Sequence, residues 1–344
     1  MKQQLRLKSH YHLLRKDGYI DFIKTLDEGI RIPENEVLDY LISSLQETSA
    51  TMEIVSKLKS TYQIPENVAE KLIQKFIDLG VFEYFTDDLP IALNRYHRQL
   101  LLFDAIQSEP QFETHIDQQL LLTHTHVLIL GIGGIGNFIA LSLTASGIGK
   151  ITLVDFDVVE ETNLNRQVLF SESDLGKSKV LQAASRLMEL NSKCTIVAIE
   201  KSIKSILDLE ELVRESGPIS YLVLAADQPP ELVLWASSLC PKYNFKYIKC
   251  GYMSYQGLIG PLLGPKTKSY EQLFEHWGAT INLQDQLIQQ QNEKFIAPSM
   301  AASNAILSNI AALEMIKDIS GIVPSCLIEK RLLFNLKTME LKFG

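Results

Sequence analysis

Apolar residues change their spacing along the chain, and over the first 85 residues they predict a small domain of strands and short helices. Strand-like runs at residues 5–14 and 19–25 flank Lys16-Asp17-Gly18, where the Asp-Gly pair favours a hairpin turn. Three segments have apolar residues at helical spacing: 37–45, 54–58 and 68–79. Gly80 stands where the last helix should end, and residues 81–85 read as a returning strand. This order predicts a winged-helix-like α+β module.

From residue 127 onward, short apolar runs alternate with helical patterns such as that of residues 177–190. Five runs are predicted to be buried strands: 127–130, 151–154, 195–199, 221–225 and 247–250. The alternation predicts an α/β domain with a Rossmann-like, mostly parallel sheet. The break at Thr86-Asp87-Asp88-Leu89-Pro90 is the predicted boundary, which divides the chain into domains 1–88 and 89–344.

Two further segments bear on the large domain. A helix predicted over residues 91 to 102 leads into it, and residues 266–298, with a glutamine-rich run at 283–291, are a candidate crossover or lid segment over the site. The uncharged stretch 127–149 is long enough to span a bilayer. Its glycines at turn-like spacing, together with Asn137, favour instead a buried strand, a loop and a helix.

Composition mainly excludes classes of protein. The chain has 344 residues, of which 46% are apolar and 22% charged, as in ordinary globular proteins. A net charge of −8 argues against a general nucleic-acid binder. The four cysteines stand far apart: Cys194, Cys240, Cys250 and Cys326. Their spacing favours reduced cytoplasmic thiols, and residues 1–6 lack the apolar core of a signal peptide, so a cytoplasmic location is expected.

The first candidate site is the glycine run Gly131-Ile132-Gly133-Gly134-Ile135-Gly136, between a strand and a helical pattern that starts near Asn137. Glycines let the backbone approach a phosphate closely, and free N–H groups at a helix start favour its charge. Asp155 closes the next strand, where a carboxylate can accept hydrogen bonds from ribose hydroxyls. Gly131, Gly133, Gly136 and Asp155 also fit the fingerprint of dinucleotide binding. The loop alone therefore leaves ATP, NAD and a simple tight turn open.

The residues beyond Asp155 favour ATP. A polar and cationic run follows the second strand: Asp157, Asn163, Asn165, Arg166, Gln167 and Lys179. Attack by a carboxylate on the α-phosphate of ATP needs such a run, because charge builds on the phosphoryl oxygens and pyrophosphate must leave. Arginine supplies a planar fork and lysine a compact charge. Asp227, just beyond strand 221–225, is placed to bind Mg²⁺ through an oxygen ligand.

With these residues in view, the sequence resembles the ThiF/MoeB superfamily of ubiquitin-activating-type adenylating enzymes. The motifs that carry the resemblance span most of residues 91–344: Arg95-Tyr96-His97-Arg98-Gln99, Gly131 to Gly136, Ser146-Gly147-Ile148-Gly149, Asp155-Phe156-Asp157, Asn163-Leu164-Asn165-Arg166-Gln167, Asp174-Leu175-Gly176-Lys177-Ser178-Lys179, and Asp227. Within the superfamily, the chain is most similar to the peptide-modifying enzymes of the microcin C and pantocin pathways. Residues 163–172, Gly251-Tyr252 and Gly260-Pro261-Leu262 carry that likeness.

The resemblance implies roles for individual residues. Asp155 would hold the ribose, and Asp227 would bind Mg²⁺. The phosphates would be contacted by Asn163, Arg166 and Lys179. The remaining residues expected at the nucleotide are Gly131, Gly133, Gly134, Gly136, Asp157 and Gln167. Arg98 would reach into the partner subunit's site, which implies a homodimer. Arg98, Arg166, Lys179 and Asp227 are thus the expected catalytic residues.

The same resemblance implies a function. The enzyme would activate a carboxylate of a ribosomally made precursor peptide in peptide antibiotic biosynthesis, using ATP and Mg²⁺. The adenylate would then cyclise internally or lead to a peptide that carries a nucleotide. Residues 1–88 would form a peptide clamp that takes up the precursor as an extra strand. A dimerisation or packing module is the alternative for this region.

The chain departs from many relatives in its cysteines. The first Cys-x-x-Cys pair of a structural zinc site is expected near Ser269-Tyr270-Glu271-Gln272, and no second pair follows, so no structural zinc is expected. No cysteine lies between Cys250 and Cys326, and Cys250 ends a strand, which disfavours thioester transfer. Three alternatives stay open: activation of a ubiquitin-like sulfur-carrier protein, a NAD-dependent oxidoreductase, and a non-catalytic, dimer-forming pseudoenzyme.

Overall fold

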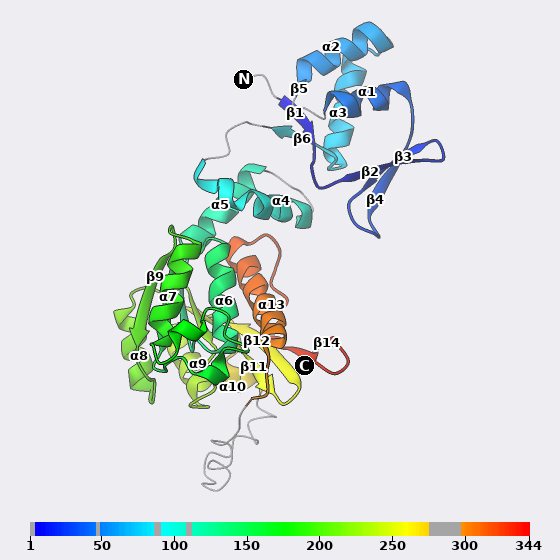
Figure 1. Ribbon diagram of the computed structural model, residues 1–344. Coiled ribbons are helices and arrows are strands. Elements are labelled where there is room, and N and C mark those ends of the chain that lie inside the picture. Colours follow the sequence, from blue (N-terminus) through cyan, green and yellow to red (C-terminus); the bar gives the residue numbers. More distant parts are fainter. Residues whose placement is uncertain (1–3, 46–48, 86–90, 108–111, 275–296) are drawn as a thin grey trace. The chain divides into compact units, whose positions relative to one another are not determined.

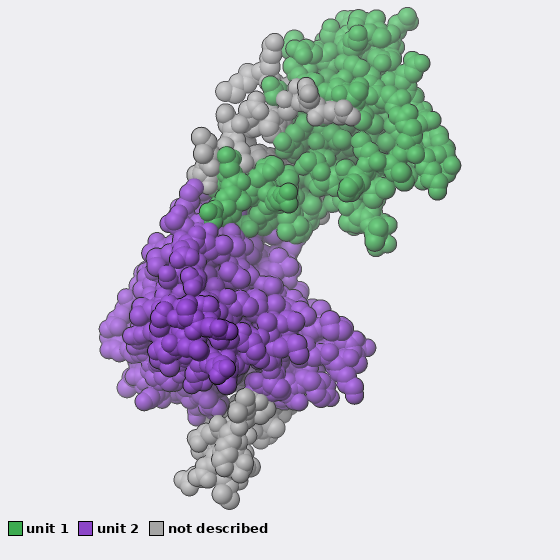
Figure 2. Space-filling view, in the orientation of Figure 1, with its two compact units in different colours: residues 1–116 green, residues 117–344 purple. Residues whose placement is uncertain are grey.

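The computed structural model describes residues 4–45, 49–85, 91–107, 112–274 and 297–344. The chain forms two compact units, residues 1–116 and residues 117–344 (Figure 2). The boundary predicted at residues 86–90 and the glutamine-rich run at 283–291 lie outside the described residues. The division into domains 1–88 and 89–344 therefore stays a prediction.

Within residues 4–45 and 49–85, the first unit forms two small antiparallel sheets and three helices (Figure 1). One sheet has the order β5-β1-β6: β5 (Ser49–Ala50), β1 (Gln4–Leu7) and β6 (Phe82–Phe85). The other has the order β2-β3-β4: β2 (His12–Lys16), β3 (Tyr19–Ile23) and β4 (Gly29–Pro33). The helices are α1 (Glu36–Ser44), α2 (Thr51–Tyr62) and α3 (Glu66–Asp78). The predicted α+β module and its three helices are confirmed.

The turn between β2 and β3 follows from the residues that form it. Asp17 and Gly18 both have positive φ, at 53° and 79°, which is the backbone of a tight two-residue hairpin turn. The predicted single strand at 5–14 is wrong, because the chain turns after β1 and its two halves enter different sheets. The turn coincides with Lys8, whose ammonium is drawn into the protein by Asp104, nearly a hundred residues further on. Sequence spacing alone carries no sign of such a contact.

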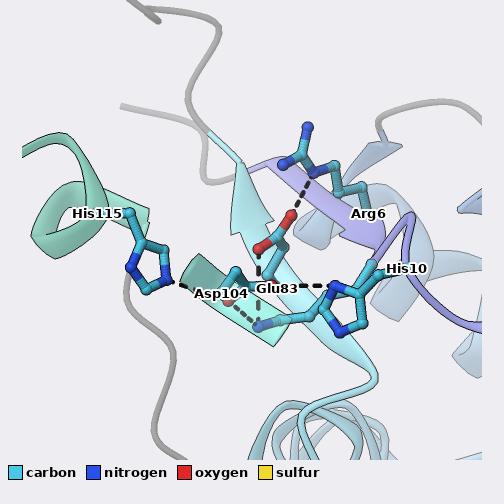
Figure 3. Close-up of polar contacts among 6 residues, drawn as sticks. Arg6, His10, Glu83, Asp104 and His115 are labelled. Carbon is cyan, nitrogen blue, oxygen red and sulfur yellow. Dashed lines mark hydrogen bonds and ion pairs between the residues drawn. The ribbon is translucent and has the colours of Figure 1, made fainter. Parts of the chain in front are cut away.

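A buried ionic cluster, formed by Lys8, His10, Glu83, Asp104 and His115, ties β1 and β6 to the helices that follow them (Figure 3). Those helices are η1 (Ile91–Tyr96), α4 (His97–Ile106) and α5 (Phe112–Thr123). Lys8 Nζ lies 2.7 Å from Asp104 Oδ1, and His115 Nε2 lies 3.3 Å from the same oxygen. Lys8 is only 3% exposed, so the cluster replaces water around several charges at once. The predicted helix at 91–102 is thus a 3₁₀ turn followed by an α-helix.

The second unit is an α/β domain around an eight-stranded sheet. Its order is β14-β13-β12-β11-β10-β7-β8-β9, with these bounds: β7 (His126–Leu130), β8 (Lys150–Asp155), β9 (Thr195–Glu200), β10 (Tyr221–Leu224), β11 (Lys246–Met253), β12 (Gln256–Leu263), β13 (Leu332–Asn335) and β14 (Glu340–Phe343). Strands β9, β8, β7, β10 and β11 are parallel, and β12 to β14 continue antiparallel. The predicted mostly parallel sheet is confirmed.

Helices cover this sheet and set the position of the loops. They are α6 (Gly134–Ala145), α7 (Lys179–Leu190), α8 (Ile206–Glu215), α9 (Leu232–Tyr243), α10 (Tyr270–Leu273) and α13 (Ala301–Ser320). Helices α6 and α13 pack side by side (Figure 1), and α8 and α9 enclose a core with alternate residues of β7 and β10. In the described part of the chain no helix is both long and apolar enough to cross a membrane. The uncharged stretch 127–149 instead forms β7, the glycine loop and α6.

The sheet topology creates one preferred place for a ligand. From β7 the chain moves outward through β8 to β9, and then returns to the other side of β7 for β10 and β11. β7 and β10 are adjacent strands, and the chain leaves them toward opposite edges of the sheet. In open parallel sheets, ligands bind in the crevice that this reversal leaves at the carboxyl ends of the strands. The glycine loop and Asp227 follow those two strands.

Candidate active site

The glycine loop is shaped by contacts that exclude side chains. Gly131 has φ +88°, and a Cβ there would lie 2.8 Å from the carbonyl of Ala225. A Cβ at Gly136 would lie 1.9 Å from the carbonyl oxygen of Gly131. Gly133 caps α6 in an extended conformation, so the first N–H groups of this helix have no acceptor within the helix itself. The loop thus combines close backbone approach with a helix start that favours anions.

Asp155 fixes the same loop. Its Oδ2 accepts a hydrogen bond of 2.7 Å from the backbone N–H of Ile132, and its Oδ1 accepts one of 2.9 Å from Asp157. A carboxylate has about four lone-pair sites, so these bonds leave acceptor capacity for a ribose hydroxyl. The predicted ribose contact of Asp155 stays a prediction, and its scaffolding of the loop is an additional role.

Asn137 is a site residue whose role the sequence did not reveal. It is fully buried in α6, and its Nδ2 donates to the carbonyl of Ile132 over 2.8 Å and to that of Gly133 over 3.1 Å. Its Oδ1 accepts from the backbone N–H of Leu169 over 2.9 Å. Asn137 therefore joins the glycine loop to the segment that carries Arg166. The only signal in the sequence was an amide inside an uncharged stretch.

The predicted cationic residues are held in place by neighbouring acceptors. Lys179 begins α7, is buried, and donates from Nζ to Asp157 Oδ2 over 2.8 Å. Arg166 is half-buried and donates to the carbonyl of Thr162 and, over 3.0 Å, to Asn165 Oδ1. These contacts hold the two cations on the β8 side of the loop. Their predicted contacts with phosphates stay predictions.

Two predicted amides have different environments. Asn163 is buried, and its Oδ1 accepts from the N–H of Glu160 over 3.1 Å, which makes it part of a local capping box. Gln167 is 3% exposed, and its Oε1 has no hydrogen-bond partner among the described residues. Its Nε2 lies 4.0 Å from the place that a Cβ on Gly133 would take. Gln167 therefore adjoins the glycine loop with unused hydrogen-bonding capacity.

Asp227 follows β10 and faces β11. A Cβ on Gly251 would lie 3.7 Å from Asp227 Oδ1. Burial raises the pKa of Asp227, and the positive charge of Lys249 opposes this rise. The residue is nevertheless exposed to solvent, so the surrounding protein removes only part of its water. No hydrogen bond or ion pair holds this carboxylate within the ranges that the structure describes.

Lys249 lies beside Asp227 and was missed in the sequence, where it reads as part of a buried strand. It is half-buried on β11, and no ion pair or hydrogen bond to its ammonium occurs among the described residues. Burial lowers the pKa of Lys249, Asp227 opposes the shift, and Arg331 adds to it. Two opposite charges thus face the same region without forming a direct ion pair.

A third group comes from the start of α13. Asn304 is 1% exposed, and its Nδ2 has no partner in the described part of the chain. A Cβ on Gly134 would lie 2.0 Å from this nitrogen, so the amide occupies room that only glycine leaves. Tyr252, on β11, lies close to Ser303 of helix α13. Burial raises the pKa of Tyr252 to about 12, and Ser303 opposes this rise. The Tyr252 hydroxyl has no hydrogen-bond partner among the described residues. The start of α13 therefore adds polar groups to the glycine loop.

The protein side chains described at this site are too few to bind a metal ion without further ligands from a bound nucleotide or water. Among the residues described, no group of three or more His, Cys, Asp or Glu side chains could hold a metal ion. Asp227 offers a carboxylate that is unpaired among the described residues, so Mg²⁺ would take its other ligands from water and from a nucleotide, as it commonly does. The predicted absence of zinc is not tested.

Cys250 is enclosed in β11, as the sequence predicted. It is 3% exposed, and burial raises its pKa to about 12. A thiol that is inaccessible and protonated cannot serve as the acceptor of an activated acyl group.

Arg98 is exposed on α4 in the first unit, and its predicted action in a partner subunit stays a prediction.

Comparison with known proteins agrees with this geometry. The model of the ThiF family matches residues 96–343. The adenylyltransferase and sulfurtransferase MOCS3 of Xenopus laevis is 46% identical over 98 residues, which are 28% of this chain and 20% of that protein. MOCS3 of Bos taurus is 37% identical over 139 residues, which are 38% of this chain and 29% of that protein. The chain therefore spans less than a third of these curated relatives.

The similarity to solved structures extends over nearly the whole chain. E. coli MccB with ATP superposes with a TM-score of 0.79 at 25% identity, covering 99% of this chain and 96% of that one. The microcin C7 biosynthetic enzyme MccB in complex with N-formylated MccA gives 0.78 at 25% identity, with the same coverage. PaaA gives 0.75 at 23% identity, covering 98% of each chain, which supports the fold alone. The predicted architecture, including the small α+β region before the large domain, is confirmed.

Proposed function

Because this chain belongs to the ThiF family of ATP-dependent adenylating enzymes, we propose that it activates a carboxylate of a ribosomally made precursor peptide. The observation that carries the proposal is the extent of the likeness. MccB, which has been solved with ATP and with MccA, matches 99% of this chain, so the match includes the N-terminal unit. The identity with MOCS3 covers at most 38% of the chain in the two relatives above.

In the proposed reaction, a carboxylate oxygen of the peptide attacks the α-phosphorus of ATP. The bond from this phosphorus to the bridging oxygen breaks, and pyrophosphate leaves with the electron pair. The glycine loop and the start of α6 would hold the phosphates, and Asp155 the ribose. Arg166 and Lys179 would stabilise charge on the phosphoryl oxygens. Mg²⁺ bound at Asp227 would neutralise charge on the leaving group.

The adenylate then has two possible fates. A neighbouring group of the peptide attacks the acyl carbon and releases AMP, which yields a cyclised product, or the reaction leads to a peptide that retains a nucleotide. The missing Cys-x-x-Cys pairs and the buried Cys250 lead us to favour direct consumption of the adenylate, with cyclisation slightly preferred. Both outcomes require the same first step.

We further propose that residues 1–88 form the peptide clamp. An extended peptide can add a strand to the exposed edge of a sheet, where main-chain hydrogen bonds give affinity. Strand β2 is an edge strand whose five residues are all exposed, and it carries two large apolar side chains, Leu13 and Leu14, at 39% and 48% exposure. Exposed apolar side chains on an edge strand are the features that such a site needs.

The decisive test is mass spectrometry of candidate short peptides incubated with enzyme, ATP and Mg²⁺. A gain of about one AMP mass would indicate nucleotide attachment, and a loss of water would indicate cyclisation. The matched control is the Asp227→Asn variant, which should give neither product. If no peptide changes mass with the wild-type enzyme, peptide activation is wrong.

The proposed homodimer can be tested by mixing inactive variants. Arg98→Ala removes the group expected to act in the partner's site, and Asp227→Ala disables a subunit's own site. A mixed dimer of the two would contain one intact site, so activity should return to a fraction of the wild-type value. Failure to recover activity, with mixing confirmed by native mass spectrometry, would rule out the arrangement in trans.

Activation of a ubiquitin-like sulfur-carrier protein is the second candidate. The identity with MOCS3, which reaches 46%, supports it. A protein that ends in two glycines should then support exchange of pyrophosphate into ATP, and short peptides should not. Tight binding of NADH without binding of ATP would instead point to an oxidoreductase, a possibility that membership of the ThiF family disfavours.

A further inference from the structure

The carboxyl ends of the parallel strands place the site groups in a row. Asp155 ends β8, the glycine loop follows β7, and Asp227 follows β10. The strand register puts Val154, Leu130, Leu224 and Lys249 opposite one another across four neighbouring strands. Lys249 therefore stands one strand beyond Asp227, on the side away from Asp155. If the nucleotide occupies the β8 and β7 side, Lys249 lies at the strand beyond it, which leaves that side for the second substrate.

The pairing of β11 with β12 is irregular opposite Lys249. Ile248 pairs with Leu262 and Cys250 with Ile259, so two residues of β12, Gly260 and Pro261, stand opposite Lys249 alone. Such a bulge bends a strand and redirects side chains, and bulges are common beside active sites. The irregularity is local, because pairing resumes on either side of it.

Arg331 reinforces the positive charge. Its Nη2 donates to the hydroxyl of Tyr270 over 2.9 Å, and its Nε donates to the carbonyl of Gly260 over 3.4 Å. The guanidinium also lies 4.1 Å from the centre of the Phe274 ring. These contacts are made with uncharged groups, so they hold Arg331 without cancelling its charge. Lys249 consequently lies within electrostatic reach of a fixed cation, Arg331, and of the carboxylate of Asp227.

We propose that Lys249 binds the peptide carboxylate that attacks the α-phosphate and makes the site prefer a carboxylate to an amide. The inference rests on the proposed function, which it makes specific to one side chain. A carboxylate that approaches ATP is repelled by the negative charge of the phosphates, and an unpaired ammonium near Asp227 offsets this repulsion. In this role Lys249 acts through its charge and transfers no proton.

The test compares three variants in peptide-dependent exchange of pyrophosphate into ATP. The substrate is the synthetic peptide found most active in the mass-spectrometric screen. Lys249→Met should raise KM for this peptide roughly 10- to 100-fold, because it removes a hydrogen bond between charged groups. KM for ATP should not change, and Lys249→Arg should restore much of the lost affinity. The matched control is Lys246→Met, at the start of β11, where the ammonium is paired with Asp318.

A second readout uses the same peptide with its reacting carboxyl group replaced by a carboxamide. The wild-type enzyme should bind the acid more tightly than the amide, as measured by competition. Lys249→Met should bind the two forms equally. A general loss of structure would weaken both forms alike and would leave their ratio unchanged, so the ratio isolates the contact with the carboxylate.

The outcomes separate the two proposals. If no peptide supports exchange with the wild-type enzyme, the proposed function fails and the inference falls with it. If the wild-type enzyme is active and Lys249→Met leaves KM for the peptide unchanged, the inference alone is wrong. It is equally overturned if KM for ATP rises in parallel with KM for the peptide, because Lys249 would then act on the nucleotide.

Discussion

A charged cluster in the first unit and the pair Asp227 and Lys249 in the second unit differ in whether their charges have partners. In the first unit, Lys8 and Asp104 are almost fully buried, and each has charged or hydrogen-bonding partners within the ionic cluster (Figure 3). In the second unit, Asp227 and Lys249 are flanked by protein, and among the described residues neither is paired. A buried charge with partners supports a fold, whereas a charge that the protein leaves unpaired is available to a ligand. The difference distinguishes a structural cluster from a binding site.

Substitution of Asp227 should separate function from stability most strongly. We expect Asp227→Asn to lower the rate of adenylation by about a thousandfold or more, because a preorganised charge at the phosphates is lost. Thermal stability should be unchanged or slightly higher, because burial raises the pKa of this carboxyl group and the ionised form is therefore disfavoured by the fold. Pyrophosphate exchange and a thermal melt measure the two effects. A large fall in melting temperature would contradict the comparison.

Substitution of Asp104 should do the reverse. Asp104→Asn leaves the buried ammonium of Lys8 without a carboxylate, which should lower the free energy of unfolding by about 3 kcal/mol. Binding of ATP to the second unit should not change. Chemical denaturation and an ATP titration measure the two quantities. The control is Asp78→Asn, at an exposed position, for which a change within about 0.5 kcal/mol is expected.

Gly134 tests whether Asn304 belongs to the glycine loop. Gly134→Ala places a Cβ 2.0 Å from Asn304 Nδ2, so the amide must move. We expect a loss of about 1–3 kcal/mol in stability and weaker binding of ATP. Adding Asn304→Ala should relieve the clash, so that the double variant is more stable than the sum of the single changes implies. Gly136→Ala is the contrasting case, because its Cβ would meet the backbone oxygen of Gly131 at 1.9 Å and no side-chain truncation can relieve it.

Acid should weaken the first unit through His10 and Asp104, and this effect should be the smallest. Burial lowers the pKa of His10 below its usual 6.5, against the opposing charge of Asp104. For Asp104, burial by itself would raise the pKa, but hydrogen bonds from His115 and Lys8 outweigh it and the pKa lies below 3.8. Both groups take up protons more readily when unfolded. Stability is therefore highest above pH 6.5 and falls as the pH drops, first through His10 and then, below about 3.8, through Asp104.

The measurement is chemical denaturation between pH 7.5 and 5. The His10→Gln variant should lose the first part of this pH dependence, since glutamine does not titrate. An identical pH profile for the variant and the wild type would show that His10 does not contribute.

Much of this molecule could be predicted from local sequence. Helical and strand periodicities located the three N-terminal helices and the five parallel strands, because burial of one face imposes its spacing on neighbouring residues. The glycine loop was equally evident, since φ +88° at Gly131 and the contact of Gly136 with Gly131 demand glycine in the sequence itself. The roles of Arg166, Lys179 and Asp227 came from their residue types after the predicted strands and from the family resemblance, and they stay predictions.

Tertiary structure decided what those residues have for neighbours. The contact of Lys8 with Asp104 divides a predicted strand, and the contact of Asn304 with Gly134 adds α13 to the nucleotide loop. Lys249 reads in the sequence as one residue of an apolar strand, and only the sheet order and the bulge opposite it place its charge beside Asp227. Sequence spacing records the side of an element on which a residue lies. Whether a buried polar group has a partner depends on segments far away in the chain, and therefore on the fold.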